Sequence, residues 1–422
     1  MNRKETLLGR IREGINDMCY IWAKEMKSVV KDEGVLIFFI IVPLLYPLLY
    51  AWVYNNEVVR EVPVAVVDLS HSSMSRQFLR HFDSSPDVKV AWHCNNLEEA
   101  QRLIGHQQAY GIVYIPTDFA TRLSRMEQST ISVYCNMSFL LYYKAIYQTA
   151  TAVVGTMNSK IQISLSGQYT DREDQLTTAP LAYDEVPLFN SAAGYGSFII
   201  PAVLILVIQQ TLLLGIGLAA GTAREQNRYR DLVPVSRHYN GIFRIVLGKS
   251  ACYAMVYAVL TAFEVLVVPR LFHFVHIGDN MTILWVMVPF VLACIFFGMF
   301  ISCIIRYREN VILLIVFTSV PFLFLTGVSW PLSSIPRVWQ GVSWLIPSTF
   351  GVRAYVRINS MGATLADVRP EYISLWIQSL VYFFLTCVVY RYQIIMARRH
   401  AIERLEEIQS SILTEQLAKE KL

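Results

Sequence analysis

Six long apolar stretches divide this chain, and a polar block separates the first of them from the other five. Each stretch is long enough to cross a hydrocarbon core of about 30 Å as a helix that rises about 1.5 Å per residue. A helix also satisfies its backbone polar groups internally, as lipid requires. The sequence therefore predicts a polytopic α-helical membrane protein with six transmembrane helices, at residues 35–54, 196–220, 250–268, 283–305, 311–330 and 372–390.

The distribution of basic residues predicts how these helices are oriented. Only 16% of the 422 residues are charged, against an average of about 25%. Lys and Arg concentrate in four segments, residues 1–34, 221–249, 306–308 and 391–422. All four lie on one side of the membrane if the N-terminus is inside, and basic loops are retained at the cytoplasmic face. Both termini are therefore predicted to be cytoplasmic, and residues 55–195 external.

The external block is predicted to fold as an α/β domain inserted between the first and second transmembrane helices. Its first strand signal, Val62–Leu69, is a continuous apolar run of the kind found in buried parallel strands. Further strand signals at 88–93, 110–115 and 131–135 alternate with helix signals, the last a long helix over 139–165. Asn96 and Thr117 are predicted helix caps. Such alternation indicates a small domain with a mostly parallel sheet.

Two of the seven cysteines, Cys94 and Cys135, fall in this block. An oxidising compartment could join them in a disulfide. The alternative is that both are buried free thiols, which behave as small apolar side chains.

Three further segments flank the apolar stretches. Residues 1–34 carry apolar side chains at three- and four-residue spacing, which predicts a cytoplasmic amphipathic helix in the membrane interface, or a helix packed on protein. The stretch Gly327–Val368 is too apolar for a free loop, with Trp330, Trp339 and Trp344 along it, and prolines interrupt it. Residues 331–370 are therefore predicted to form short re-entrant or interfacial helices on the outer side. Residues 391–422 form a predicted cytoplasmic helical tail.

No catalytic, metal or cofactor-binding constellation is found in the sequence. The run Leu247-Gly248-Lys249-Ser250 resembles the end of a phosphate-binding loop, but Phe243 stands where that motif needs its upstream glycine. The chain is therefore not expected to bind nucleotide itself. A nucleic-acid partner is not expected either.

Polar side chains are few within the apolar stretches and are candidates for a substrate path. Glu264 is the only acid among them, and an ionisable group inside a membrane is a functional hypothesis by default. The alternative is that Arg270, six residues further on, or water satisfies it and that it serves packing alone. The notable neutral residues are Gln209, Gln210, Thr318 and Ser319.

Residues 221–249 form the longest basic loop between two spans and are a candidate docking site for a cytoplasmic partner. Apolar residues and a proline interrupt the charges, as in a short docking helix followed by a turn. The alternative is a solvated loop that only obeys the charge rule. The residues predicted to contact the partner are Glu225, Arg228, Arg230, Leu232, Pro234 and Arg237.

The order and spacing of several motifs resemble the permeases of the ABC-2 family, which have the type V exporter fold, and in particular the branch with a large external domain after the first span. The similar segments are Pro63–Asp68, Tyr110–Pro116, Leu232–Arg237, Leu247–Lys249, Phe297–Ser302, Phe322–Pro331 and Trp344–Phe350. One departure lies in the loop, where Glu225 is followed by Gln226–Arg230 and not by the Gly-Thr pair common in the family.

This resemblance implies the transmembrane subunit of an ATP-driven exporter in a bacterial inner membrane. ATP and magnesium would be bound by separate cytoplasmic ATPase subunits, and a second permease chain, identical or a sibling, would complete the path. A periplasmic adaptor is a further partner that the resemblance allows. The alternative function is that of a non-transporting envelope protein whose external domain binds a partner. The sequence leaves the cargo open.

Overall fold

The computed structural model of this protein describes residues 7–166, 170–179, 186–191, 193–225, 241–305 and 307–420. The chain divides into two compact units. Residues Met1–Asn55 and Phe189–Leu422 form one, here called the helical unit, and residues Asn56–Leu188 form the other, called the α/β unit.

The α/β unit is built on a four-stranded sheet with strand order β2-β1-β3-β4. The central strand β1 (Val62–Asp68) is parallel to both β2 (Val88–His93) and β3 (Gly111–Ile115), and β4 (Ser132–Cys135) is antiparallel to β3. Both faces of β1 are buried, which is why its sequence is continuously apolar. The sheet is thus mostly parallel, as the sequence predicts.

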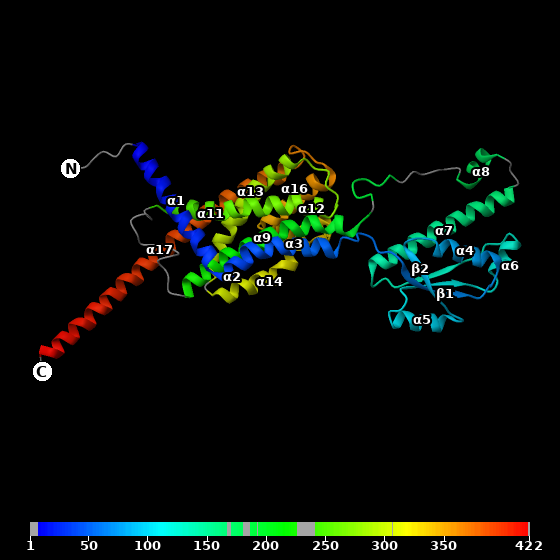
Figure 1. Cartoon of the computed structure of the whole chain (residues 1–422), viewed down its shortest axis with the longest axis horizontal. Helices are drawn as coiled ribbons and strands as arrows, with labels where there is room; N and C mark the ends of the chain where they lie inside the picture. The colour runs from blue at the N-terminus through cyan, green and yellow to red at the C-terminus, as the bar shows by residue number, and fades with distance from the viewer. Residues whose placement is uncertain are drawn as a thin grey trace. The chain divides into compact units, whose positions relative to one another are not determined.

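Helices cover both faces of this sheet, as Figure 1 shows. One face packs against α4 (Ser73–Asp83), α6 (Phe119–Ser124) and α7 (Leu140–Ser166), and the other against α5 (Leu97–Gly105). A short helix, α8 (Asp171–Thr178), follows α7. The predicted cap Asn96 accepts a hydrogen bond from the backbone N–H of Glu99 at 2.8 Å. Thr117 is not a cap, because α6 begins one residue later and its N-cap position is Asp118.

Cys94 and Cys135 are free thiols in this structure, so the disulfide is not formed. Cys94 directly follows β2 and Cys135 ends β4, which are the two edge strands of the sheet. Three inter-strand steps of about 4.8 Å separate these edges, whereas a disulfide needs a Cα–Cα distance of about 4.4–6.8 Å. Burial raises the pKa of both thiols, and the charge of Glu99 adds to this effect at Cys94.

Among the residues of the helical unit that the structure describes, six helical segments are long and apolar enough to cross a membrane, which confirms the predicted polytopic helical architecture. Three of the segments are single helices, α9 (Tyr195–Glu225), α13 (Asn280–Ile304) and α14 (Arg308–Leu325). Two contain a π-helical turn. The first joins α2 (Glu33–Leu36), η1 (Ile37–Ile41) and α3 (Val42–Val53), and the third joins α11 (Ile242–Ala262), η2 (Phe263–Val267) and α12 (Val268–Leu271).

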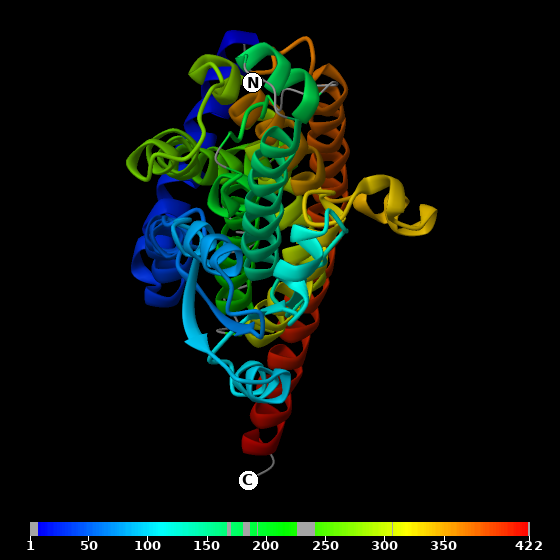
Figure 2. The same cartoon turned by 90° about the vertical axis from the view of Figure 1, so that its right-hand side faces the viewer.

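The sixth segment is the start of α17 (Arg369–Glu420), which is one continuous helix of 52 residues. Figure 2 shows it as the red ribbon that runs to the C-terminus. It therefore contains both the predicted span at 372–390 and the predicted helical tail. An amphipathic helix, α1 (Leu7–Lys31), precedes the first segment.

The second segment, α9, is the centre of the helical unit. In the most apolar stretch of α9, 89% is buried inside the protein, because α3, α13, α14 and α16 all pack against this helix. The η1 turn directs Phe39 towards α9, where the ring lies over Gly215 and meets Tyr253 and Tyr257 edge-on. A Cβ atom at Gly215 would lie 1.9 Å from the Phe39 ring, so only glycine permits this approach.

Residues 331–370 form η3 (Leu332–Ser334), α15 (Arg337–Ser343) and α16 (Pro347–Met361). The helix α15 is largely exposed, with Ser343 as its buried residue. In contrast, α16 packs against α9, α13 and α17, and nine of its residues are buried. The short helices predicted here therefore include one that enters the bundle core.

Candidate functional site

Gln209 lies at the centre of α9 with no exposed surface and holds the start of α16. Its side-chain Oε1 accepts a hydrogen bond from the backbone N–H of Ser348 at 2.7 Å, and the Cys294 thiol points to the same oxygen at 3.9 Å. The first N–H groups of a helix have no partner within the helix, and Pro347 removes one of them. Gln209 therefore caps a helix that begins inside the bundle.

Several other polar atoms inside the bundle have no hydrogen-bond partner among the described residues. They include Nε2 of Gln209, both side-chain polar atoms of Gln210, and the hydroxyls of Ser348 and Thr349. A buried polar group without a partner costs about 1–3 kcal/mol. Such groups in a membrane bundle are suited to bind water or a polar part of a cargo.

Glu264 lies in the π-helical turn η2 and is completely buried. Neither of its carboxyl oxygens has a hydrogen-bond partner in the part of the chain that the structure describes. The next carbonyl, that of Val265, accepts a hydrogen bond from the Tyr355 hydroxyl at 3.0 Å, which ties the turn to α16. Arg270 is not a partner of Glu264 in this structure, and its guanidinium donates instead to Asn280 Oδ1 at 2.8 Å.

Thr318 and Ser319 are held differently from the other candidates. Their hydroxyls donate to carbonyls of their own helix α14, Thr318 to Leu314 at 2.7 Å and Ser319 to Val316 at 2.9 Å. The structure therefore ties Gln209 to α16 through its side chain, and ties the turn that holds Glu264 to α16 through the Val265 carbonyl. It gives Thr318 and Ser319 no hydrogen bond to another helix among the described residues.

A second cluster of polar residues joins α1 to α11 through buried ion pairs. Lys249 Nζ donates to Glu25 Oε2 at 2.8 Å, and the Tyr253 hydroxyl donates to the other oxygen of Glu25. Two turns earlier along α1, Asp17 accepts a bond from Arg244 Nη1 at 2.7 Å. Lys249 is 5% exposed and Glu25 9%, so solvent screens their attraction little.

A third ion pair extends this cluster, here called the α1 ion pairs, to the fifth apolar segment. Asp32 lies 3.5 Å from the guanidinium of Arg308, the first residue of α14, and also caps α2 by accepting from the N–H groups of Gly34 and Val35. Thus α1, together with Asp32 directly after it, forms ion pairs with residues near the N-terminal ends of both α11 and α14.

The three acids of this cluster are not among the site residues predicted from the sequence. A signal was present, because Asp17, Glu25 and Asp32 recur at spacings of eight and seven residues, about two helical turns, within and directly after a helix otherwise rich in Lys and Arg. Acids that share one face of a basic helix indicate basic partners on that side.

The predicted docking loop lies mostly outside the described residues. Glu225 is the last residue of α9, and α11 begins at Ile242. The remaining predicted contact residues, Arg228, Arg230, Leu232, Pro234 and Arg237, belong to residues 226–240, which the structure does not describe. The structure does describe α11, the helix that follows this loop, and there Arg244 and Lys249 form ion pairs with acids of α1.

Among the described residues, no three His, Cys, Asp or Glu side chains are arranged to hold a metal ion. The polar clusters instead belong to a bundle of apolar helices. Together with the six candidate spans, they define the class of a multi-pass membrane transport protein.

The chain belongs to the ABC-2 family of transporter proteins, whose family model matches residues 34–388. It is therefore a permease, a transport subunit without catalytic function, and a multi-pass bacterial membrane protein. Membership in this family implies an ATPase partner and a permease partner.

A weaker similarity extends to individual curated proteins. The chain is 24% identical over 341 residues to the probable multidrug ABC transporter permease YbhS of Escherichia coli strain K12. The match covers 78% of this chain and 84% of the relative, and the same values hold for YbhS of Escherichia coli O157:H7.

Proposed function

We propose that this protein is the permease subunit of an exporter that moves cargo from the cytoplasm or inner leaflet to the outside, driven by ATP that a separate cytoplasmic ATPase hydrolyses. Two permease chains, identical or sibling, form the path. The similarity to a probable multidrug permease supports apolar, drug-like cargo. The protein resides in the inner membrane with both termini in the cytoplasm, and the α/β unit is external, where a periplasmic adaptor is a fitting partner.

The observation that carries this proposal is the buried attachment of α11 to α1 through Glu25 and Lys249. If residues 226–240 only connected two spans, the helix that follows them would not need to be held in place by buried ion pairs. Here the helix that follows residues 226–240 is fixed by buried ion pairs, so a push on the loop moves α11 together with α1. Fixed elements of this kind can transmit a nucleotide-driven change at a partner to the bundle.

Arg228 and Arg230 are expected to contact the ATPase, with Glu225, Leu232, Pro234 and Arg237 around them. Reversing both arginines to Glu should place unfavourable charges at the contact, which costs several kcal/mol when desolvated. We expect co-purification of the ATPase and permease-stimulated ATP hydrolysis to fall at least tenfold.

The matched control is the double reversal of Arg102 and Arg125, two exposed arginines of the α/β unit. This variant should retain wild-type co-purification and stimulation. If the reversal at 228 and 230 also leaves both unchanged, residues 226–240 are only a connector.

Glu264 is proposed to act on the cargo path. Because its carboxyl oxygens have no partner among the described residues, Glu264→Gln should leave packing and expression unchanged. Glu264 is the only acid within the six apolar stretches of the sequence, and its loss is expected to lower cargo transport severalfold while ATPase assembly is retained. Equal transport by wild type and Glu264→Gln, measured in vesicles with the same amount of complex, would assign Glu264 to packing alone.

A further inference from the structure

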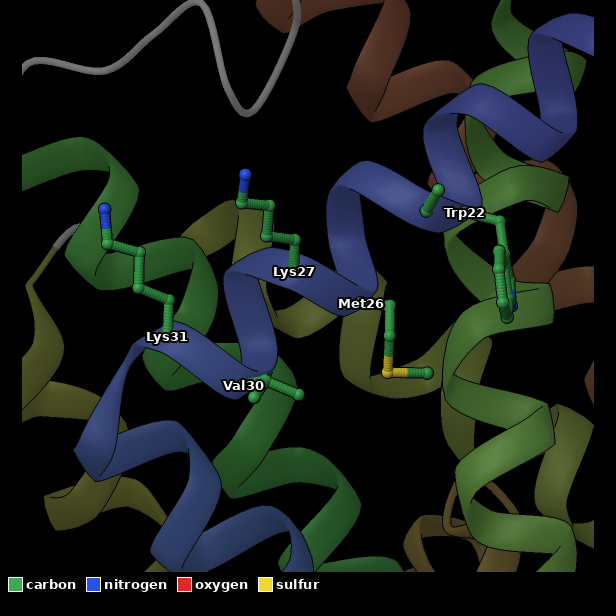
Figure 3. Close-up of a pocket in the computed structure, with 6 residues that line it drawn as sticks. Trp22, Met26, Lys27, Val30 and Lys31 are labelled. Carbon is green, nitrogen blue, oxygen red and sulfur yellow. The ribbon is translucent and has the colours of Figure 1, made fainter.

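One face of α1 remains open beside the face that carries the α1 ion pairs. Its side chains line a groove of about 450 Å³ formed by Trp22, Ala23, Met26, Lys27, Val30 and Lys31. Figure 3 shows Lys27 and Lys31 extending to one side of the helix, while Trp22 and Met26 extend to the other. Val30 is 56% exposed, which is unusual for a β-branched apolar residue on a packed helix.

Charge is segregated around α1. Asp17, Glu25 and Asp32 point to the protein and pair with basic residues of α11 and α14. Lys27 and Lys31 lie along the open groove and form no ion pair with any residue that the structure describes. The open face is therefore apolar and positive, with no carboxylate in the groove lining to neutralise it.

The position of the groove along the chain bears on what fills it. Lys31 is the last residue of α1, and the first candidate membrane span begins at Glu33. The Lys31 end of the groove is thus within one helical turn of the start of the first candidate span, and the groove extends from there along α1 to Trp22. At that depth, phosphate groups and the upper part of acyl chains surround a protein, and Trp is a preferred residue.

We propose that this groove binds an anionic phospholipid, with the phosphate between Lys27 and Lys31 and the acyl chain along Trp22, Met26 and Val30. Long Lys side chains beside an apolar stripe extend their ammonium groups to headgroups in this way. A second copy of this chain fits less well, because a two-fold contact of two such faces would bring their lysines together.

The test uses the fluorescence of Trp22 in the intact permease. Wild type and Trp22→Phe are reconstituted in nanodiscs of phosphatidylcholine that contain increasing fractions of a lipid brominated on its acyl chains, either phosphatidylglycerol or phosphatidylcholine. The difference between the two proteins gives the signal of Trp22 among the eight tryptophans. The measured quantity is the mole fraction of brominated lipid that quenches half of this signal.

Brominated phosphatidylglycerol is expected to quench Trp22 at a lower fraction than brominated phosphatidylcholine. This preference should fall about fivefold for each lysine lost in Lys27→Gln and Lys31→Gln, since a basic residue at an anionic leaflet contributes about that factor. It should also fall at high salt, and Lys27→Arg/Lys31→Arg should retain it. The control Lys160→Gln, on an exposed position of α7, should have no effect.

Two outcomes would overturn the proposal. Equal quenching by the two brominated lipids would mean that lipid contacts the groove without recognition of its charge. No quenching by either lipid would mean that protein covers the groove, and a disulfide crosslink between two copies of Met26→Cys would then identify a second permease chain as the occupant.

Discussion

Lys249→Met is expected to destabilise the helical unit by about 3–5 kcal/mol, because it leaves the Glu25 carboxylate buried without its basic partner. The remaining Tyr253 hydroxyl still donates to Glu25 but carries no charge to balance it. We expect the detergent-purified variant to lose its monodisperse peak in size-exclusion chromatography at a markedly lower temperature than wild type.

The double variant Glu25→Gln/Lys249→Met separates the charge effect from packing. It removes both charges and keeps an amide oxygen to accept from Tyr253, so it should recover most of the lost stability, since a buried pair contributes little net free energy. Lys160→Met, at an exposed site, should match wild type. If the single and double variants are equally unstable, the pair is not the cause.

Gly215→Ala is expected to give the second large effect. The new methyl group would lie 1.9 Å from the ring of Phe39, which is fully buried and cannot move aside. Overpacking of a core costs about 1–3 kcal/mol, and the first apolar segment should loosen from α9. The loss of the monodisperse peak on heating again gives the measurement.

Phe39→Leu in the Gly215→Ala background should recover stability, because the smaller side chain leaves room for the methyl group. Gly155→Ala is the matched control. Gly155 lies within α7 and a Cβ there meets no atom within 4 Å, so this change should be neutral or stabilising. Normal stability of Gly215→Ala would contradict the close approach of the first span to α9.

The membrane spans and the strands were predictable from sequence because their signals are local. Length and hydropathy define a span without reference to its neighbours, and a continuous apolar run such as Val62–Leu69 already indicates a strand buried on both faces. The start of β2 at Val88 and its end at His93 agree with the predicted strand. The cap at Asn96 is also encoded within four residues.

The features that were missed depend on partners distant in the chain. The acids of α1 form ion pairs with α11, which lies more than two hundred residues later in the chain. Gln209 can cap α16 only because α16 starts inside the bundle. The choice between a disulfide and two free thiols could not be made from sequence for the same reason, because strand order puts Cys94 and Cys135 on opposite edges of the sheet. Arg270 was close to Glu264 in sequence but pairs with Asn280 in space.

We propose that an ATPase docks on residues 226–240, which link α9 to α11. This is tested most directly by photo-crosslinking in intact bacteria from a benzoylphenylalanine that replaces Leu232. The control carries benzoylphenylalanine in place of Trp92, an exposed residue of β2. An adduct is expected at 232, and not at 92, with a polypeptide that contains a phosphate-binding loop and binds ATP. An adduct at 232 that contains no ATPase, or an ATPase adduct formed from position 92, would contradict it.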